Sequence, residues 1–456
     1  MRITSLTLRN FKAIGPVEQR INFRPITLLY GPNSAGKSTI VQALHYLSEI
    51  LSRNNCDPGT TQIGGKLNLG GFRNLVHLHD PDTPIELGLG LTLGDSLLSG
   101  YGGDGEEEHL LLGEVLGSEQ VYDLNQVASV EVRLIVRWSR QLQQAYVADY
   151  FVAVNGEAFA RISATADQKQ IILSELNCEH AMFSESLTED EESLSVGNGL
   201  QNLLDEYVTA PETISGEVIT SPLQLRFAHG AMPVFGASLP LAPTTDRLDE
   251  EESDPRQQRT EKEQKEAERR EEEIRQAERK FASLTRYLSR IVVGAGELAR
   301  DCLQQFIYLG PLRDIPGRHY SPELSPGLAR WSSGLGAWDQ LYNEGETLVE
   351  KVNAWLADDK RLDAGYEIHY SEYKPLPLDS PLMVALRRGD EELFESSEWI
   401  QAQLDAIDTR RQVTLRDQRT DIDLHPEDLG TGISQVLPVL VAALGHNKNI
   451  VAIEQP

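Results

Sequence analysis

The stretch "GPNSAGKST", residues 31–39, decides the fold. It fits the pattern G-x-x-x-x-G-K-[ST], and its neighbours have the character that a phosphate-binding loop needs. The apolar run "ITLLY" at 26–30 precedes it and predicts a buried strand. Residues 38–51 follow it with apolar residues at helical spacing. A chance glycine-rich turn is the alternative, but both neighbours favour a P-loop.

The chemistry of such a loop depends on its glycines and on the helix that follows. Glycines let backbone N–H groups approach phosphate oxygens closely, and the helix N-terminus adds partial positive charge. Lys37 is expected to reach the β- and γ-phosphates, and the Ser38 hydroxyl is expected to ligate Mg²⁺. The expected nucleotide-binding residues here are Gly31, Asn33, Ser34, Ala35, Gly36, Lys37, Ser38 and Thr39.

A P-loop protein also needs a second acid, on a neighbouring strand, to complete the Mg²⁺ shell. The stretch "NIVAIEQP" at 449–456 has this form, because an apolar run ends at Glu454. A surface glutamate that closes an ordinary core strand is the alternative. Upstream, "DLGTGISQVLPVL" at 428–440 opens an apolar helix with a Gly-x-Gly turn, which leaves the helix N-terminus open to an anion. "NKNI" at 447–450 lacks the aspartate of the guanine motif N-K-x-D, which weakens a GTPase interpretation.

Composition narrows the functional classes. The chain of 456 residues has a net charge of −28, with acidic runs at 104–108, 188–193 and 249–254 that we expect to be solvated loops. This charge repels nucleic acid, so a DNA contact would need a local basic patch, a metal or a partner. Three well separated cysteines fit a reducing cytosol. Without a membrane-spanning apolar run or a signal peptide, we expect a cytoplasmic protein.

Hydrophobic periodicity predicts four segments. They are an N-terminal lobe with the P-loop at 1–52, a β-rich part at 53–240, a charged helical insertion at 241–299 and a C-terminal lobe at 300–456. The insertion is expected to hold one long helix that starts solvated and becomes amphipathic from Ile274. The predicted strands are 2–11, 19–23, 85–93, 128–138, 145–154, 158–164, 170–176, 304–310, 366–373, 382–389, 411–424 and 449–453, and the predicted helices of the C-terminal lobe are 336–359 and 433–447.

The order of these motifs resembles that of SMC/RecF-like ABC-type ATPases. The resemblance rests on "LRNFKAIG" at 8–15, "YGPNSAGKST" at 30–39, "GTGISQ" at 430–435 and "IVAIEQP" at 450–456. With "YLGPLRDIPGRHY" at 308–320, the chain is similar to the OLD/RecF-like AAA ATPases of prokaryotic operons, many of them in anti-phage defence. The resemblance covers the two ends of the chain well and the middle loosely. It implies an α/β fold, a P-loop NTPase of the ABC-type head with a β-rich insertion and a charged helical insertion.

The resemblance also implies a mechanism. Two ATP molecules, each with Mg²⁺, would lie between two heads of a homodimer or higher oligomer. Each nucleotide would meet the P-loop of one subunit and the signature helix of the other. Carried over to this chain, the signature residues that face the γ-phosphate in trans are Gly430, Thr431, Gly432 and Ser434, and the residues near the nucleotide on the N-terminal side are Arg9, Asn10 and Lys12. Arg313 and Arg318 form either a functional basic pair or structural contacts.

The sequence departs from this family pattern at two places. Gln455 stands where most ABC ATPases have the glutamate that acts on the attacking water. An amide cannot accept a proton as a carboxylate does, although it can position water. With Glu454 and Gln455 as the catalytic pair, we expect slow hydrolysis and a long-lived ATP-bound dimer. In the family, the sequence continues beyond "EQP" into a dimer-contact loop and a histidine, so we expect this chain to be a fragment.

Several functions fit these motifs. The first is an ATP-dependent switch that dimerises on ATP and controls a partner effector, such as a nuclease, or a DNA-processing event, in anti-phage defence. The alternatives are the N-terminal ATPase part of an OLD-type DNA endonuclease, a RecF-like repair ATPase, and a nucleotide-binding scaffold that barely hydrolyses. The histidines form no H-E-x-x-H and no zinc spacing, so the sequence itself contains no recognisable nuclease site.

Overall fold

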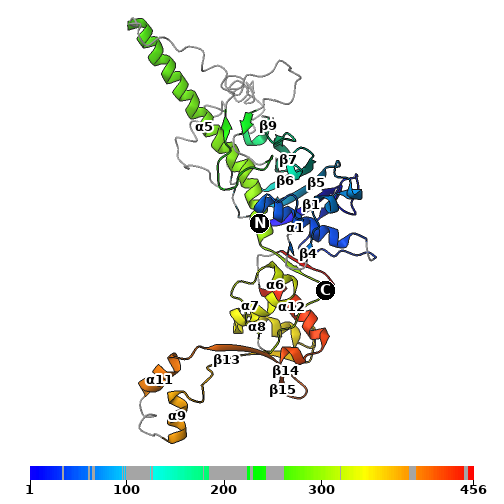
Figure 1. Ribbon diagram of the computed structural model, residues 1–456, viewed down its shortest axis with the longest axis vertical. Coiled ribbons are helices and arrows are strands. Elements are labelled where there is room, and N and C mark those ends of the chain that lie inside the picture. The colour runs from blue at the N-terminus through cyan, green and yellow to red at the C-terminus, as the bar shows by residue number, and fades with distance from the viewer. Residues whose placement is uncertain are drawn as a thin grey trace, which may run out of the picture. The chain divides into compact units, whose positions relative to one another are not determined.

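In the computed structural model the chain forms two compact units (Figure 1). The sheet unit comprises Met1–Thr61 and Asn68–Gln304, and the C-terminal unit comprises Gln62–Leu67 and Gln305–Pro456. The described residues are 1–32, 35–59, 62–63, 67–94, 96, 98, 124, 127–177, 179–183, 223–225, 230–242, 261–318, 320–389, 397–445 and 450–455. The acidic runs at 104–108, 188–193 and 249–254, and Cys178, lie outside them.

The sheet unit is built on one nine-stranded sheet in the order β11-β10-β9-β8-β7-β6-β5-β1-β2. Every neighbouring pair in it is antiparallel. Residues alternate between buried and half-buried along β6, which is the pattern of a strand with one face on the core. The strands are β1 (Arg2–Arg9), β2 (Gln19–Asn22), β5 (Ile85–Thr92), β6 (Ser129–Ser139), β7 (Gln144–Val154), β8 (Glu157–Ala164), β9 (Ile171–Leu176), β10 (Leu223–Leu225) and β11 (Leu241–Ala242).

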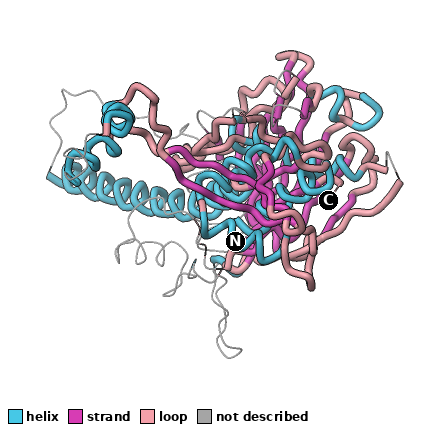
Figure 2. The backbone as a smooth tube through the Cα atoms, turned by 90° about the horizontal axis from the view of Figure 1, so that it is seen from below, coloured by secondary structure: helices cyan, strands magenta, loops and turns pink. Residues whose placement is uncertain are grey.

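Two helices pack with this sheet. Helix α1 (Lys37–Arg53) contacts α5 (Glu261–Gln304), which also contacts β6. Figure 2 shows α5 as one long helix. Most of its side chains from Ser283 onward are buried. The hydroxyl of Tyr150 on β7 donates to the carbonyl of Val292 on α5 at 2.8 Å. The prediction of one long helix is therefore confirmed, and the described side chains at 269, 272, 275 and 279 are exposed as that prediction expects. The unit also contains α2 (Phe72–Leu75) and the 3₁₀ turns η1 (His77–His79) and η3 (Ala181–Phe183). The strands β3 (Gln62–Ile63) and β4 (Leu67–Asn68) form a separate short sheet, and residues 62–67 belong to the C-terminal unit.

The C-terminal unit holds a parallel pair of strands and a three-stranded antiparallel sheet. Strand β12 (Phe306–Leu309) pairs in parallel with β16 (Ile450–Ile453), with Leu309 opposite Ile453. The antiparallel sheet has the order β13-β14-β15. The strands of this sheet are β13 (Tyr366–Tyr373), β14 (Arg410–Asp417) and β15 (Ile422–Leu424). The helices of the unit are α6 (Leu328–Ser332), α7 (Leu335–Glu344), α8 (Glu346–Leu356), α9 (Pro381–Arg388), α11 (Ser397–Asp405) and α12 (Thr431–Gly445), with the 3₁₀ turn η4 (Pro426–Asp428).

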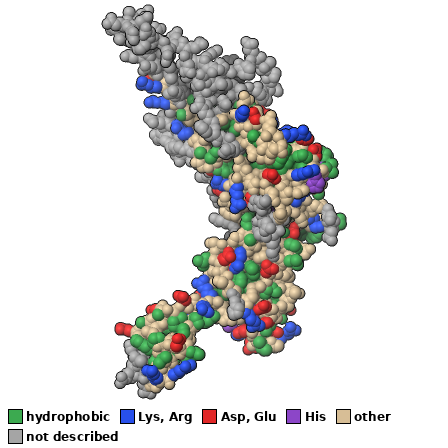
Figure 3. Space-filling model, viewed as in Figure 1, with side chains coloured by type: hydrophobic (Ala, Val, Ile, Leu, Met, Phe, Trp, Pro, Cys, Tyr) green, Lys and Arg blue, Asp and Glu red, His purple; other side chains and the backbone are tan. Residues whose placement is uncertain are grey.

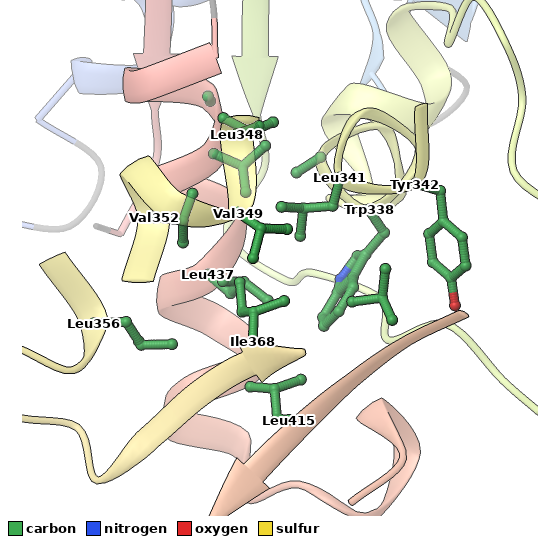
Figure 4. Close-up of a cluster of buried hydrophobic side chains, with 14 of the residues drawn as sticks. Trp338, Leu341, Tyr342, Leu348, Val349, Val352, Leu356, Ile368, Leu415 and Leu437 are labelled. Atoms are coloured by element: carbon green, nitrogen blue, oxygen red, sulfur yellow. The ribbon is translucent and has the colours of Figure 1, made fainter. Parts of the chain in front are cut away.

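The core of this unit lies between α7, α8, α12 and the sheet β13–β14 (Figure 4). Trp338 on α7 is fully buried and packs among leucine, valine and isoleucine side chains from these elements. Removing a buried tryptophan side chain costs about 3–5 kcal/mol. This core fixes α12 against α7 and α8, and so holds the start of α12 in place. Away from the core, Figure 3 shows apolar side chains among charged ones on the pair α9 and α11, where Leu386 is 54% exposed.

Two of the strands predicted from the sequence, at 26–30 and 382–389, are wrong. Residues 26–30 form no strand and pair with none of the described strands, and Ile26 and Tyr30 are 81% and 85% exposed. A strand needs a neighbour for its backbone N–H and C=O groups, and apolar character alone does not supply one. Residues 382–388 lie in helix α9 and not in a strand, because Ser380 caps the helix N-terminus, Pro381 starts it and Gly389 follows its end in the left-handed region.

The predicted helix at 336–359 is two helices. Gly345, with φ 62° and ψ −140°, separates α7 from α8. A residue with a side chain rarely adopts this backbone conformation, so the glycine turns the chain where the periodicity continues. Residues 411–424 likewise contain two strands, β14 and β15, joined by a turn. The mixed α/β character is confirmed. Within the described residues, no helix is both long enough and apolar enough to cross a membrane.

Candidate functional site

The P-loop enters α1 through a left-handed glycine. Gly36 has φ 89° and ψ 13°, and α1 begins at Lys37 with no side-chain cap and no acid in its first turn. The Thr39 N–H donates to the Gly36 carbonyl at 3.0 Å and the Ala35 N–H donates to the Pro32 carbonyl at 3.3 Å. A helix N-terminus without a capping acid keeps N–H groups and partial positive charge for an anion. The local geometry thus suits phosphate.

Lys37 spans the loop. Its Nζ donates to the carbonyl oxygens of Gly31 at 2.9 Å and Pro32 at 2.8 Å. A phosphate group that binds Lys37 would replace these carbonyls as the acceptor. Ser38 is exposed at the start of α1, whereas Thr39 is buried. The predicted residues Asn33 and Ser34 lie outside the described residues.

The turn after β1 lies against the P-loop. A Cβ added at Gly36 would lie 3.5 Å from the Cβ of Ala13. Arg9 forms an ion pair with Glu86, and the Asn10 amide donates to the Pro84 carbonyl at 3.1 Å, so both make structural contacts. Lys12 is half-buried, and burial lowers its pKa. In the described part of the chain no carboxylate lies within ion-pair distance of Lys12, which leaves its ammonium able to meet an anion.

In the C-terminal unit, Glu454 follows β16 directly. Its backbone N–H donates to the Leu309 carbonyl at 3.0 Å, which extends the pairing of β12 with β16 to this residue. The carboxylate of Glu454 is hydrogen-bonded to Tyr308 on β12, and burial together with this carboxylate raises the pKa of the Tyr308 phenol. Gln455 is exposed and has φ 52° in the left-handed region.

The signature stretch starts α12. Gly430, Thr431 and Gly432 are exposed, and Ser434 is fully buried with its Oγ donating to the Thr431 carbonyl at 3.0 Å. The exposed backbone of residues 430–432 is therefore the part of this stretch that is accessible to an anion. The Ser434 hydroxyl is engaged within the helix.

The two candidate arginines have different surroundings. Arg313 is 5% exposed and donates to main-chain carbonyls of Gln435, Glu454 and Gln455. Arg318 is exposed and forms an ion pair with Asp428, with both oxygens 2.9 Å from its Nη2. Tyr308 and Gln435 were not predicted as contact residues, although both lie in stretches that carry the resemblance. Within the described residues no cluster of three or more His, Cys, Asp or Glu side chains could hold a metal.

Comparisons with known proteins concern mainly the N-terminal part. The family model of an AAA domain matches residues 5–65. The DNA replication and repair protein RecF of Roseiflexus castenholzii (strain DSM 13941 / HLO8) is 43% identical over 53 residues, which are 11% of this chain and 13% of RecF. The chain therefore matches only a small part of the length of this curated relative.

One solved structure comes from work on the ATP-driven dimerization and DNA-stimulated activation of SMC ATPases. It is 17% identical and covers 37% of this chain and 74% of its own, with a TM-score of 0.20. A superposition at this score is too weak to establish a shared fold. The prediction of a P-loop segment similar to RecF is thus confirmed at the N-terminus, where residues 5–65 carry an AAA-type domain match.

Proposed function

We propose that this chain is the ATP-binding part of an SMC/RecF-like ABC-type ATPase that hydrolyses ATP slowly. The observation that carries the proposal is the P-loop geometry, in which left-handed Gly36 opens an uncapped, acid-free helix start at Lys37. The AAA domain match over residues 5–65 supports it. A chance glycine-rich turn would need neither that helix start nor this match.

The residues present fit ATP with Mg²⁺. Glycine backbone and the α1 N-terminus would hold the phosphates, with Lys37 donating to the β- and γ-phosphates. Exposed Ser38 has the hydroxyl that Mg²⁺ prefers at this position, and Glu454 is our candidate for the second acid of the metal shell. Mg²⁺ would supply charge neutralisation for the leaving phosphate oxygens. Lys12 is our candidate for an additional phosphate contact.

Slow turnover follows from Gln455. A carboxylate at this position would accept a proton from the attacking water, while the amide of Gln455 can only orient that water through hydrogen bonds. We therefore propose a turnover below about 10 s⁻¹. A long-lived ATP-bound state suits a switch better than a motor.

We further propose that ATP binding closes a homodimer or higher oligomer. The exposed residues Gly430–Gly432 support this, because they offer a helix start with no acid in its first turn that a partner's nucleotide could meet. Such a dimer would act as a switch on a partner effector, such as a nuclease or another DNA-processing activity, in anti-phage defence. The RecF match favours a second candidate, a DNA repair ATPase. DNA-stimulated hydrolysis without a protein partner would support that second candidate.

Binding of a fluorescent ATP analogue with Mg²⁺ tests the central proposal. Lys37→Ala should weaken binding by about 10- to 100-fold, since a hydrogen bond to a charged group contributes about 1.5–3 kcal/mol. Lys169→Ala, at an exposed lysine of the same unit, is the matched control and should bind normally. Glu454→Gln should keep nucleotide binding and lose hydrolysis. Light scattering with and without ATP tests the dimer. A wild-type chain that binds no nucleotide would refute the proposal.

A further inference from the structure

Arg313 joins the first turns of α12 to the residues that follow β16. Its Nη1 donates to the Gln435 carbonyl at 2.8 Å. Its Nη2 donates to the carbonyls of Glu454 at 2.9 Å and Gln455 at 3.3 Å. One planar guanidinium thus holds together the start of helix α12 and the residues that follow strand β16. Two of the three bonded carbonyls belong to Glu454 and Gln455, which we assign to the metal and the attacking water.

The contact is reciprocal. The Gln435 side chain accepts from the Arg313 N–H at 3.3 Å through Oε1 and donates to the Arg313 carbonyl at 3.0 Å through Nε2. Gly334 makes room for this arrangement, because a Cβ there would lie 2.8 Å from the Arg313 Cβ. Gly334 also has φ +83°, which a residue with a side chain rarely adopts. Hydrogen bonds in both directions therefore hold Arg313 to the first part of α12.

Burying the charge of Arg313 has a desolvation cost, which argues that this side chain does more than fill space. Arg313 is 5% exposed and burial lowers its pKa. Among the described residues no carboxylate lies within ion-pair distance of it, and its partners there are main-chain carbonyls. An apolar side chain would fill the same space without this desolvation cost. An apolar side chain cannot donate hydrogen bonds to both segments, whereas a guanidinium has several N–H donors in a fixed, planar arrangement.

The strand end that Arg313 holds is itself in an unusual conformation. Gln455 has φ 52°, and non-glycine residues persist in the left-handed region when their surroundings fix them. The bond from Arg313 to the Gln455 carbonyl is one such restraint. A change in the position of α12 would therefore reach the backbone of residues 454–455 directly.

We propose that Arg313 is a positioning residue that couples the signature helix to the Glu454–Gln455 segment, and through it the two ATP sites of a dimer. This inference rests on the proposed function. The start of α12 would meet the partner's nucleotide, whereas Glu454 and Gln455 would act on the nucleotide of their own subunit. Binding of ATP at one site would then place the catalytic segment of the other, so that hydrolysis depends on ATP concentration in a sigmoidal way.

Steady-state hydrolysis against ATP concentration tests the coupling in the full chain. Wild type should give a sigmoidal curve. Arg313→Lys keeps the charge and loses the fork, so it should give a hyperbolic curve and lower kcat by about tenfold, a typical coupling strength. Its affinity for the fluorescent ATP analogue, measured without hydrolysis, should stay within about twofold of wild type. Arg387→Lys, at an exposed arginine of α9, is the control and should leave the curve unchanged.

A second variant keeps the test decisive if Arg313→Lys fails to fold. Gln435→Leu removes the side-chain half of the contact and leaves the guanidinium bonds, so it should reduce sigmoidicity in part, and thermal melting would verify its fold. A hyperbolic wild-type curve, or folded variants with unchanged curves, would overturn the coupling while ATP binding stands. Failure of the wild type to bind ATP would instead overturn the proposed function.

Discussion

Asp339 is fully buried, and Arg330 binds it with two parallel hydrogen bonds of 2.7 Å from Nε to Oδ2 and 2.6 Å from Nη2 to Oδ1. Tyr320 and the backbone N–H of Glu323 donate to the same carboxylate. Asp339 on α7 thus fixes the end of the segment that begins with Tyr308 and contains Arg313. Three residues of the segment between β12 and α7 therefore converge on one buried carboxylate.

Asp339→Asn should lower the free energy of unfolding by about 3 kcal/mol, because it removes the buried charge partner of Arg330 and leaves only the more distant Glu323 carboxylate, at 3.5 Å from Nε. Chemical denaturation measures this change. Asp359→Asn, at an exposed aspartate of the same unit, should change stability by less than about 0.5 kcal/mol. Equal effects of the two substitutions would mean that the carboxylate is not essential to this loop.

His45 predicts a pH dependence of stability. It is buried in α1, and burial lowers its pKa from 6.5 to about 4. The unfolded chain therefore binds the proton first, so stability is complete above pH 6.5 and falls as the pH drops toward 4, by about 3 kcal/mol. His45→Gln should remove this part of the loss, while His79→Gln, at an exposed position, should keep it. Denaturant melts at several pH values compare the three proteins.

The buried thiols predict protection from alkylation. Burial raises the pKa of Cys56 to about 12 and that of Cys302 to about 11, so neither forms the reactive thiolate at neutral pH. In a Cys178→Ser background, the native protein should therefore show no fast reaction with a thiol reagent, and both thiols should react in denaturant. A thiol that reacts at once in the native state would contradict this burial.

Gln455→Glu tests the origin of slow hydrolysis. A carboxylate there can accept the proton of the attacking water, so kcat should rise by about 100-fold. Gln412→Glu, at an exposed residue of β14, adds the same charge elsewhere and should leave kcat unchanged. A lower or unaltered rate in Gln455→Glu would mean that another group acts on the water.

Local patterns predicted much of the fold. Periodicity that each segment carries by itself predicts α1, α5 and seven strands of the nine-stranded sheet, namely β1, β2 and β5 to β9. The short strands β10 and β11 were not predicted. Residues 382–389 were misassigned because the apolar pattern outweighed the signals at Ser380, Pro381 and Gly389, which start and end a helix. Residues 26–30 were misassigned because a strand depends on a partner, and no pattern within five residues specifies that partner.

The candidate site also combines residues that a local pattern predicts with contacts between distant segments that no local pattern predicts. The P-loop is a contiguous motif, so its residues and their roles could be predicted from one stretch. Arg313 and Gln435 are 122 residues apart, and neither shows by itself that they bond. The contact of Tyr308 with Glu454 depends on the parallel pairing of β12 and β16, which the sequence does not specify. These contacts could therefore not be predicted without the fold.

The exposed stretch at 26–30 has a consequence for handling the protein. "ITLLY" is uncharged, free of proline and rich in residues that favour strands, and it has no strand partner in the described residues. Windows of this kind seed intermolecular β-pairing and aggregation. Concentrated samples should therefore self-associate through this stretch. Leu28 is 64% exposed, so Leu28→Lys should delay this self-association, because a charge in the stretch opposes pairing between chains.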